Sequence, residues 1–171
     1  TINLAGFSND GALIYTTALT DLFLWDLEQL EPDAPEPAPM TFPNLIQGVR
    51  FSPDDQLLAV FLWDNSAETR SVATGETVAL GIQHRNYLRG MEFSQDGEVL
   101  MTASVDGVVL LSDPHSAELL AAPLTLPDPL AAAALSPDNP HLLTVSRKEP
   151  GSFLMGQRWR IAPSRREPAT V

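Results

Sequence analysis

The chain of 171 residues contains no cysteine. This absence excludes disulfide bonds, thiolate metal sites and cysteine nucleophiles. Because cysteine-free chains occur on both sides of a membrane, the absence leaves the cellular compartment open. Of the possible compartments we favour the cytoplasm. No apolar run reaches the roughly 20 residues of a membrane-spanning helix, and the first ten residues show no signal-peptide pattern. The sequence therefore predicts no direct insertion into a membrane.

Basic residues are scarce, with 10 Lys and Arg against 22 Asp and Glu and a net charge of −12. This balance argues against nucleic acid as a partner, because a phosphate backbone is bound by clustered Lys and Arg. Residues 1–40 contain seven acidic residues and no basic one, whereas residues 147–171 contain six basic and two acidic residues. We interpret the difference as solvated loops, with docking of the basic end on an acidic surface as the alternative.

Catalytic and metal-binding motifs are also lacking. The sequence has no Gly-rich phosphate-binding loop, and His84, His115 and His141 lack the short spacing of zinc ligands. Carboxylates are plentiful, but the most regularly spaced ones belong to a repeated turn, and the needs of folding explain their presence there. We therefore expect no enzyme activity, no metal and no cofactor.

One short phrase recurs four times along the chain. The phrase consists of a bulky apolar residue, Ser, a variable residue, Asp and then Gly, Asp or Asn. It begins at Phe7, Phe51, Phe93 and Leu135, at intervals of 44, 42 and 42 residues. Asp and Asn hydrogen-bond their own backbone in tight turns, and Gly accepts positive φ. Each phrase therefore predicts a strand that runs into a tight turn.

A short apolar, β-rich stretch follows each turn, as expected for buried strands: Ala12 to Tyr15, Leu57 to Leu62, Val99 to Thr102, and Leu142 to Val145. A third strand follows at a similar offset in units one and three, and a more polar fourth strand closes units two and three. Four strands in about 42 residues are typical of a propeller blade. Ala131 to Leu135 looks helical in isolation, but the repeat predicts a strand there.

The predicted fold is thus an all-β propeller of about four four-stranded antiparallel blades, with about fifteen strands and no helix longer than two turns. The expected blades span residues 1–42, 43–84, 85–126 and 127–163, a Pro-rich inter-blade loop covers residues 31–43, and a basic tail covers residues 164–171.

These register-matched copies resemble the WD40 repeat family. In that family the third strand ends in Trp-Asp, and Trp25-Asp26 lies at the expected place, 18 residues after Phe7. The pair Trp63-Asp64 lies only 12 residues after Phe51. The resemblance therefore places Asp64 in the turn between the second and third strands. The positions aligned with Trp25-Asp26 in the other units are degenerate: Arg70-Ser71, Ser112-Asp113 and Trp159-Arg160.

The family also has a Gly-His pair before the first strand of a blade. His84 stands nine residues before Phe93, with Gln83 in place of the glycine. The resemblance implies that His84, Ser104 and Asp106 belong to the family's structural hydrogen-bond network, in which Ser112 replaces the tryptophan. We expect His84 to lie within hydrogen-bond reach of Ser104 or Asp106.

In propellers of this family, the loops before the first strand and between the second and third strands meet on one face. The resemblance therefore makes Gln47, Arg50, Tyr87 and Arg89 the candidate partner surface, since Tyr and Arg dominate interface hot spots. An exposed tyrosine with no contact role is the alternative.

Propellers close with about four to eight blades. The resemblance implies the C-terminal half of a larger propeller, similar to bacterial WD40 arrays, whose open ends are covered by further blades of the same polypeptide or by another subunit. The expected function is a non-catalytic scaffold for protein partners, as a subunit of an assembly or a regulatory domain. The alternative is a TolB-like periplasmic or hydrolase-associated propeller that binds a peptide or small ligand, because its blades also begin with Ser-Pro-Asp turns.

Overall fold

The computed structural model of the chain contains fifteen strands and no helix in the residues that it describes. These are residues 3–31, 35–136, 141–149 and 152–160, with backbone only for residues 147–149 and 152–160. The expected basic tail, residues 164–171, lies outside them.

The strands form four antiparallel sheets in chain order. The first sheet contains β1 (Leu4–Phe7), β2 (Leu13–Ala18), β3 (Asp21–Asp26) and β4 (Met40–Thr41). The second contains β5 (Ile46–Phe51), β6 (Leu57–Leu62), β7 (Ser66–Ser71) and β8 (Thr77–Gln83). The third contains β9 (Leu88–Phe93), β10 (Leu100–Ser104), β11 (Val108–Ser112) and β12 (Leu124–Thr125). The fourth contains β13 (Leu130–Leu135), β14 (His141–Glu149) and β15 (Ser152–Arg160).

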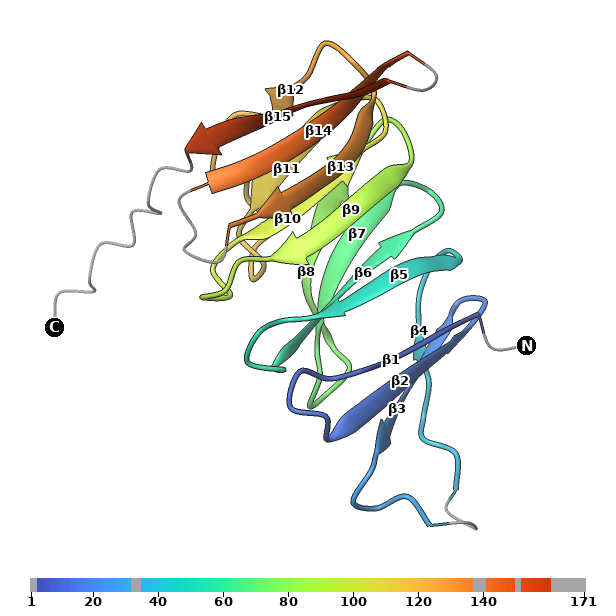
Figure 1. Cartoon of the computed structure of the whole chain (residues 1–171). Helices are drawn as coiled ribbons and strands as arrows, with labels where there is room; N and C mark the ends of the chain where they lie inside the picture. Colours follow the sequence, from blue (N-terminus) through green and yellow to red (C-terminus); the bar gives the residue numbers. More distant parts are fainter. Residues whose placement is uncertain (1–2, 32–34, 137–140, 150–151, 161–171) are drawn as a thin grey trace, which may run out of the picture.

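The all-β propeller fold predicted from the repeat is confirmed, with four, four, four and three described strands per sheet. Residues 131–135 belong to β13, so the periodicity of the chain outweighs the local helical preference of the alanines. The sheets follow one another along an open row, with β1, β5, β9 and β13 on one side and the first and fourth sheets at opposite ends (Figure 1).

The repeated Ser-x-Asp phrase forms the turn between the first and second strands of a sheet. Ser8 Oγ donates a hydrogen bond to Asp10 Oδ1 at 2.6 Å and accepts one from the Leu13 amide at 2.9 Å. The same pair of bonds recurs with the same lengths at Ser52, Asp54 and Leu57 and at Ser94, Asp96 and Val99. Donation by the serine hydroxyls lowers the pKa of Asp10 and of Asp54. Each turn thereby fixes which residues face each other on the two strands.

Apolar side chains fill the space between successive sheets. Each inner sheet is apolar on both faces because a neighbour covers each face. The first junction packs Leu13, Tyr15, Leu22 and Leu24 against Phe51, Leu58, Val60 and Leu62. The second packs Leu57, Ala59 and Ala67 against Met91, Phe93 and Leu100, and the third packs Met101, Ala103 and Val109 against Leu130 and Leu142.

A polar contact also joins the first two turns. Asp55 occupies the turn position that Gly11 and Gly97 fill in the neighbouring units, and it has the positive φ of 56° that favours glycine. Its carboxylate accepts hydrogen bonds from the Asn9 amide at 2.9 Å, the Asn9 side chain at 2.8 Å and the Asp10 amide at 3.0 Å. These charge-assisted bonds between sheets offset the strain of the backbone.

Gly48 and Gly90 occupy equivalent places in the strand registers of the second and third sheets, but their cross-strand neighbours differ in size. Gly48 pairs with Phe61, and a Cβ added to Gly48 would lie 2.0 Å from the phenylalanine ring. Gly90 pairs with Ala103, and its nearest atom would be 4.0 Å away. The large aromatic ring therefore requires glycine at position 48 alone.

We predict that Gly48→Ala lowers the free energy of unfolding by roughly 1–3 kcal/mol, because the Phe61 ring must move into a packed junction. Gly90→Ala should leave it unchanged or raise it by up to about 1 kcal/mol, since its site has room and alanine restricts the unfolded chain. Urea denaturation of both variants measures the difference. Equal stability of the two variants would contradict the packing argument.

Candidate functional site

His84 lies in the segment before β9 and is buried. Its Nε2 is 2.8 Å from Thr102 Oγ1 on β10, whereas Ser104 donates to Asp106. The expected contact of His84 with Ser104 or Asp106 is thus replaced by one with Thr102. Ser104, two residues further along β10, instead serves the turn between β10 and β11, where its carbonyl accepts a hydrogen bond from the Gly107 amide at 3.1 Å. Burial lowers the pKa of His84, while the Asp106 charge acts in the opposite direction.

Different parts of this arrangement occur in the other sheets. In the first sheet Trp25 Nε1 donates to Thr16 Oγ1 at 3.0 Å, and Thr16 is the register equivalent of Thr102. Ser112 takes the equivalent place of Trp25 in the third sheet, and its buried hydroxyl has no partner among the described residues. The third sheet therefore keeps the histidine–threonine contact and lacks the tryptophan.

The second sheet has a cation–π contact in place of these hydrogen bonds. Phe42 stands nine residues before Phe51, where His84 stands before Phe93, and Val60 is the register equivalent of Thr102. The Arg70 guanidinium lies 4.1 Å from the Phe42 ring centroid and its Nε donates to Glu68 at 2.8 Å. A cation–π contact thus takes the place of the buried hydrogen bond.

The two remaining residues of the expected structural network lie at strand ends. Asp26 ends β3 and accepts hydrogen bonds from the Glu28 amide at 2.9 Å and the Gln29 side chain at 2.6 Å. Asp64 lies between β6 and β7 and accepts a bond from the Ser66 hydroxyl at 2.6 Å. Both carboxylates therefore stabilise local turns.

The contact between His84 and Thr102 can be tested with substitutions that the second sheet already uses. His84→Phe and Thr102→Val should each lower the free energy of unfolding by about 1–3 kcal/mol, because each leaves a buried polar group without its partner. The double variant should lose less than the sum of the two, since neither group then remains unsatisfied. Urea denaturation of the four proteins measures the coupling, and strict additivity would contradict the contact.

The lowered pKa of His84 also predicts a pH dependence. Below its ordinary value of 6.5 the unfolded histidine binds a proton that the buried one resists. The free energy of unfolding should therefore be constant above that pH and decrease as the pH falls towards the pKa of the folded state. His84→Phe should remove this component between about pH 7.5 and about pH 5 in urea denaturation. An unchanged slope in the variant would contradict the assignment.

Exposed apolar side chains lie on the loops at one end of the first three sheets. Trp63, between β6 and β7, and Tyr87, before β9, are each 53% exposed, and their rings meet edge to face with centroids 6.2 Å apart. The Trp63 amide donates to the Leu45 carbonyl at 3.0 Å, and the Ile46 amide donates to the Leu19 carbonyl at 3.0 Å. Leu19, Leu45, Trp63 and Tyr87 are all exposed, and we call them the apolar row.

Tyr87 is a predicted member of the partner surface, whereas the sequence predicts a turn at Asp64 and no contact role for Trp63. The missed indication is that the turn position of Trp63 is also apolar at its register equivalents, Leu19 and Val105. Turn formation does not explain an apolar residue at this position in three successive units, which is exposed in two of them and partly buried at Val105.

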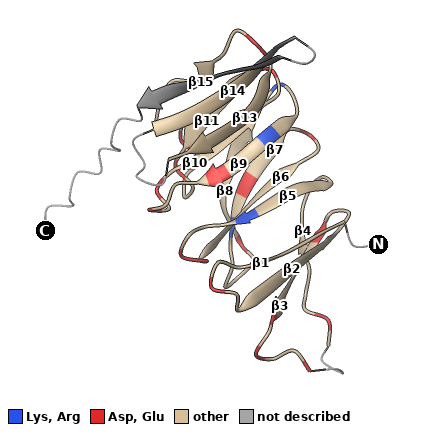
Figure 2. Ribbon diagram, in the orientation of Figure 1, with Lys and Arg blue, Asp and Glu red and all other residues tan. Residues whose placement is uncertain are grey.

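Gln47, Arg50 and Arg89 belong to the inner strands β5 and β9 and not to the loops. Figure 2 shows basic residues on these two strands, whereas most acidic residues lie in loops. Arg50 Nη1 donates to the carbonyl of Val49 at 2.8 Å, and Gln47 Oε1 is buried. The four candidate partner residues are therefore divided between two surfaces.

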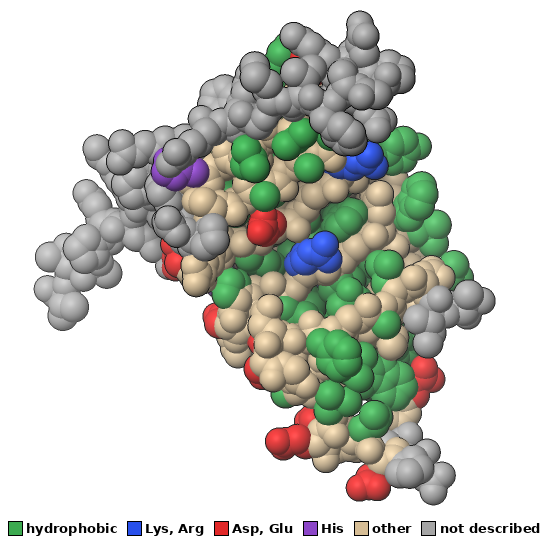
Figure 3. Space-filling view, viewed as in Figure 1, with side chains coloured by type: hydrophobic (Ala, Val, Ile, Leu, Met, Phe, Trp, Pro, Cys, Tyr) green, Lys and Arg blue, Asp and Glu red, His purple; other side chains and the backbone are tan. Residues whose placement is uncertain are grey.

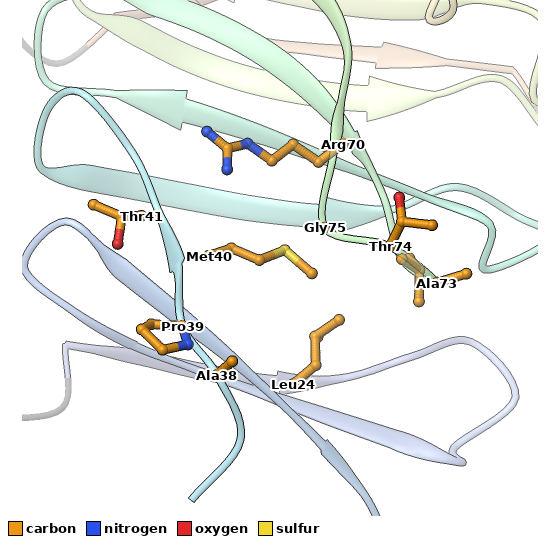
Figure 4. A pocket seen from close by; sticks show the side chains of 10 residues that line it. Leu24, Ala38, Pro39, Met40, Thr41, Arg70, Ala73, Thr74 and Gly75 are labelled. Atoms are coloured by element: carbon orange, nitrogen blue, oxygen red, sulfur yellow. The ribbon is translucent and has the colours of Figure 1, made fainter.

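A pocket of about 340 Å³ lies between the first and second sheets (Figure 4). Leu24 and Met40 line one side, and Arg70 and the segment from Ala73 to Gly75 line the other. Arg70 is already engaged by Glu68 and Phe42, so its guanidinium serves the fold.

No group of three or more potential metal-ligating side chains is found among the described residues. The same part of the chain has no helix of the length and apolar character needed to cross a membrane.

Comparison with known proteins adds three findings. Residues 76–113, from the residue before β8 to the residue after β11, match the family model for the WD domain, G-beta repeat. Periodic tryptophan protein 2 of Arabidopsis thaliana is 36% identical over 61 residues, which make up 36% of this chain and 7% of that protein. The crystal structure of the computationally designed Ika4 protein superimposes with a TM-score of 0.71 and 13% identity over 95% of this chain and 92% of the other. At that identity the likeness concerns the fold alone.

Proposed function

Since the sheets form a propeller and residues 76–113 match the WD40 repeat family, we propose that the chain is a non-catalytic scaffold that binds protein partners through its apolar row. The observation that carries the proposal is the edge-to-face pair of Trp63 and Tyr87, which is half exposed where the second and third sheets meet. WD40 propellers generally bind other proteins and generally lack catalytic activity, and the match over residues 76–113 includes Tyr87.

The physical basis is the behaviour of exposed aromatic residues. Trp and Tyr are enriched among the residues that dominate the binding energy of protein interfaces, because they bury a large area and still offer a polar group. The two rings of this pair already restrain each other, so less side-chain freedom is lost on binding. An apolar surface that extends over several loops is also unusual for a region with no contact role.

The proposed partner is a protein, since the net charge of −12 disfavours a nucleic acid backbone. We propose further that the chain acts as a subunit of an assembly or as a regulatory domain of a longer protein. The alternative is a TolB-like propeller for a peptide or small ligand, which the pocket beside Met40 supports. We favour the scaffold because the pocket's cationic group is held by Glu68 and Phe42.

The experiment is a comparison of partner recovery from extracts of the source organism. The double variant Trp63→Ser/Tyr87→Ser should reduce recovery of specific partner proteins at least about tenfold, as expected when hot-spot residues worth more than 1.4 kcal/mol are lost. The matched control is Leu80→Ser, because Leu80 is 61% exposed but lies on the outer strand β8.

A photo-crosslinking residue at position 87 should capture the same partners, and one at position 80 should not. Equal recovery by the double variant and the control would contradict the proposal. Saturable binding of a small ligand that a substitution of Met40 abolishes would favour the TolB-like alternative instead.

A further inference from the structure

Every junction between neighbouring sheets joins two different kinds of face. We call the face of a sheet that packs on the preceding sheet its leading face and the face that packs on the following sheet its trailing face. The leading faces of the second and third sheets contain Phe51 and Leu58, and Phe93 and Leu100. The trailing faces of the same sheets contain Ala59 and Met101. Each junction therefore brings one trailing face against one leading face.

No sheet among the described residues covers the leading face of the first sheet. Phe7 is the register equivalent of Phe51 and Phe93, yet it is 65% exposed, whereas each of those is 9% exposed. On the same face Ile14 and the Phe23–Trp25 ring pair are only partly buried. Figure 3 shows hydrophobic side chains gathered at the surface over the first sheet.

The trailing face of the fourth sheet is open in the same way. Leu143 on β14 is 48% exposed, although its register equivalents Met101 and Ala59 are fully buried. Val145 lies two residues further along the strand, where Ala103 lies in the third sheet, and it is only partly buried. In the described part of the chain, one leading face and one trailing face thus remain without a neighbouring sheet, at opposite ends of the row (Figure 1).

These two faces are complementary in the same way as the faces of the three junctions within the chain, because each junction packs one trailing face on one leading face. The strands of the two end sheets also differ in the charge of their sequences. Residues 3–31 contain five acidic residues and no basic one, whereas β14 and β15 contain Arg147, Lys148, Arg158 and Arg160 against Glu149. Opposite charges favour a first sheet beside a fourth sheet over a pairing of two like ends.

We propose that a second copy of the chain covers both faces, with the fourth sheet of each copy packed on the first sheet of the other. Two copies then close a ring of eight sheets, which is within the roughly four to eight blades of known propellers. The contact between the copies is head-to-tail. Because a two-fold rotation returns to the first copy, both end faces of each copy are then covered. The apolar row lies on the loops and stays accessible, so this pairing is independent of the proposed scaffold function.

The test uses one substitution in each face. Phe7→Glu damages the leading face and Leu143→Glu the trailing face, and because both side chains are exposed in a single copy, each variant should keep its fold. Analytical ultracentrifugation should show that the unmodified chain has twice the mass of one copy and that each variant alone is a monomer. A mixture of the two variants should form a dimer again, since the intact trailing face of one meets the intact leading face of the other.

Leu80→Glu is the control, because it adds the same charge at an equally exposed apolar position outside both faces, and it should remain a dimer. Circular dichroism and a cooperative urea transition verify that each variant is folded. A monomeric unmodified chain, a dimer of either single variant alone, or no association of the two folded variants on mixing would overturn the proposal. Species heavier than a dimer would overturn the closed ring.

Discussion

The hydrogen bonds of the Ser-x-Asp turn determine the register on which the packing of the whole molecule depends. A serine hydroxyl that binds a carboxylate two residues later and an amide five residues later permits only one way for the next strand to leave the turn. Phe7 then faces Ile14, and the same pairing places Phe51 opposite Leu58 and Phe93 opposite Leu100. A shift by one residue would exchange the two faces of a strand and bring the wrong side chains into the junctions.

The interior polar contacts are less uniform than the turns. The third sheet uses His84 and Thr102, the first uses Trp25 and Thr16, and the second uses Arg70 on Phe42. A buried hydrogen bond contributes about 1 kcal/mol net, so an apolar or cation–π contact can replace both partners at small cost. Loss of one partner alone is costly, and this explains why the second sheet has apolar residues at both the histidine and the threonine positions.

Much of the architecture could be predicted from the sequence because spacing alone determines it. The four copies of the turn predict the four sheets, and they predict a strand where the alanines of 131–135 suggest a helix. The partner of His84 could not be predicted in the same way, because Thr102 and Ser104 lie two residues apart on one strand and the spacing of the repeat does not decide which hydroxyl reaches the ring. The exposed pair of Trp63 and Tyr87 depends on two residues that are distant in sequence, and only the assembled sheets bring their rings together.

The exchange of size between Gly48–Phe61 and Gly90–Ala103 bears on how the repeated units have diverged. A bulky ring on one strand is tolerated only with the smallest residue on its neighbour, so the two positions must change together or in a fixed order. The second and third units thus fill the same position between two strands with different pairs of residues. The corresponding strands of these units are then not interchangeable. A chimera that receives the strand with Phe61 without the strand with Gly48 would contain a steric clash between the two strands.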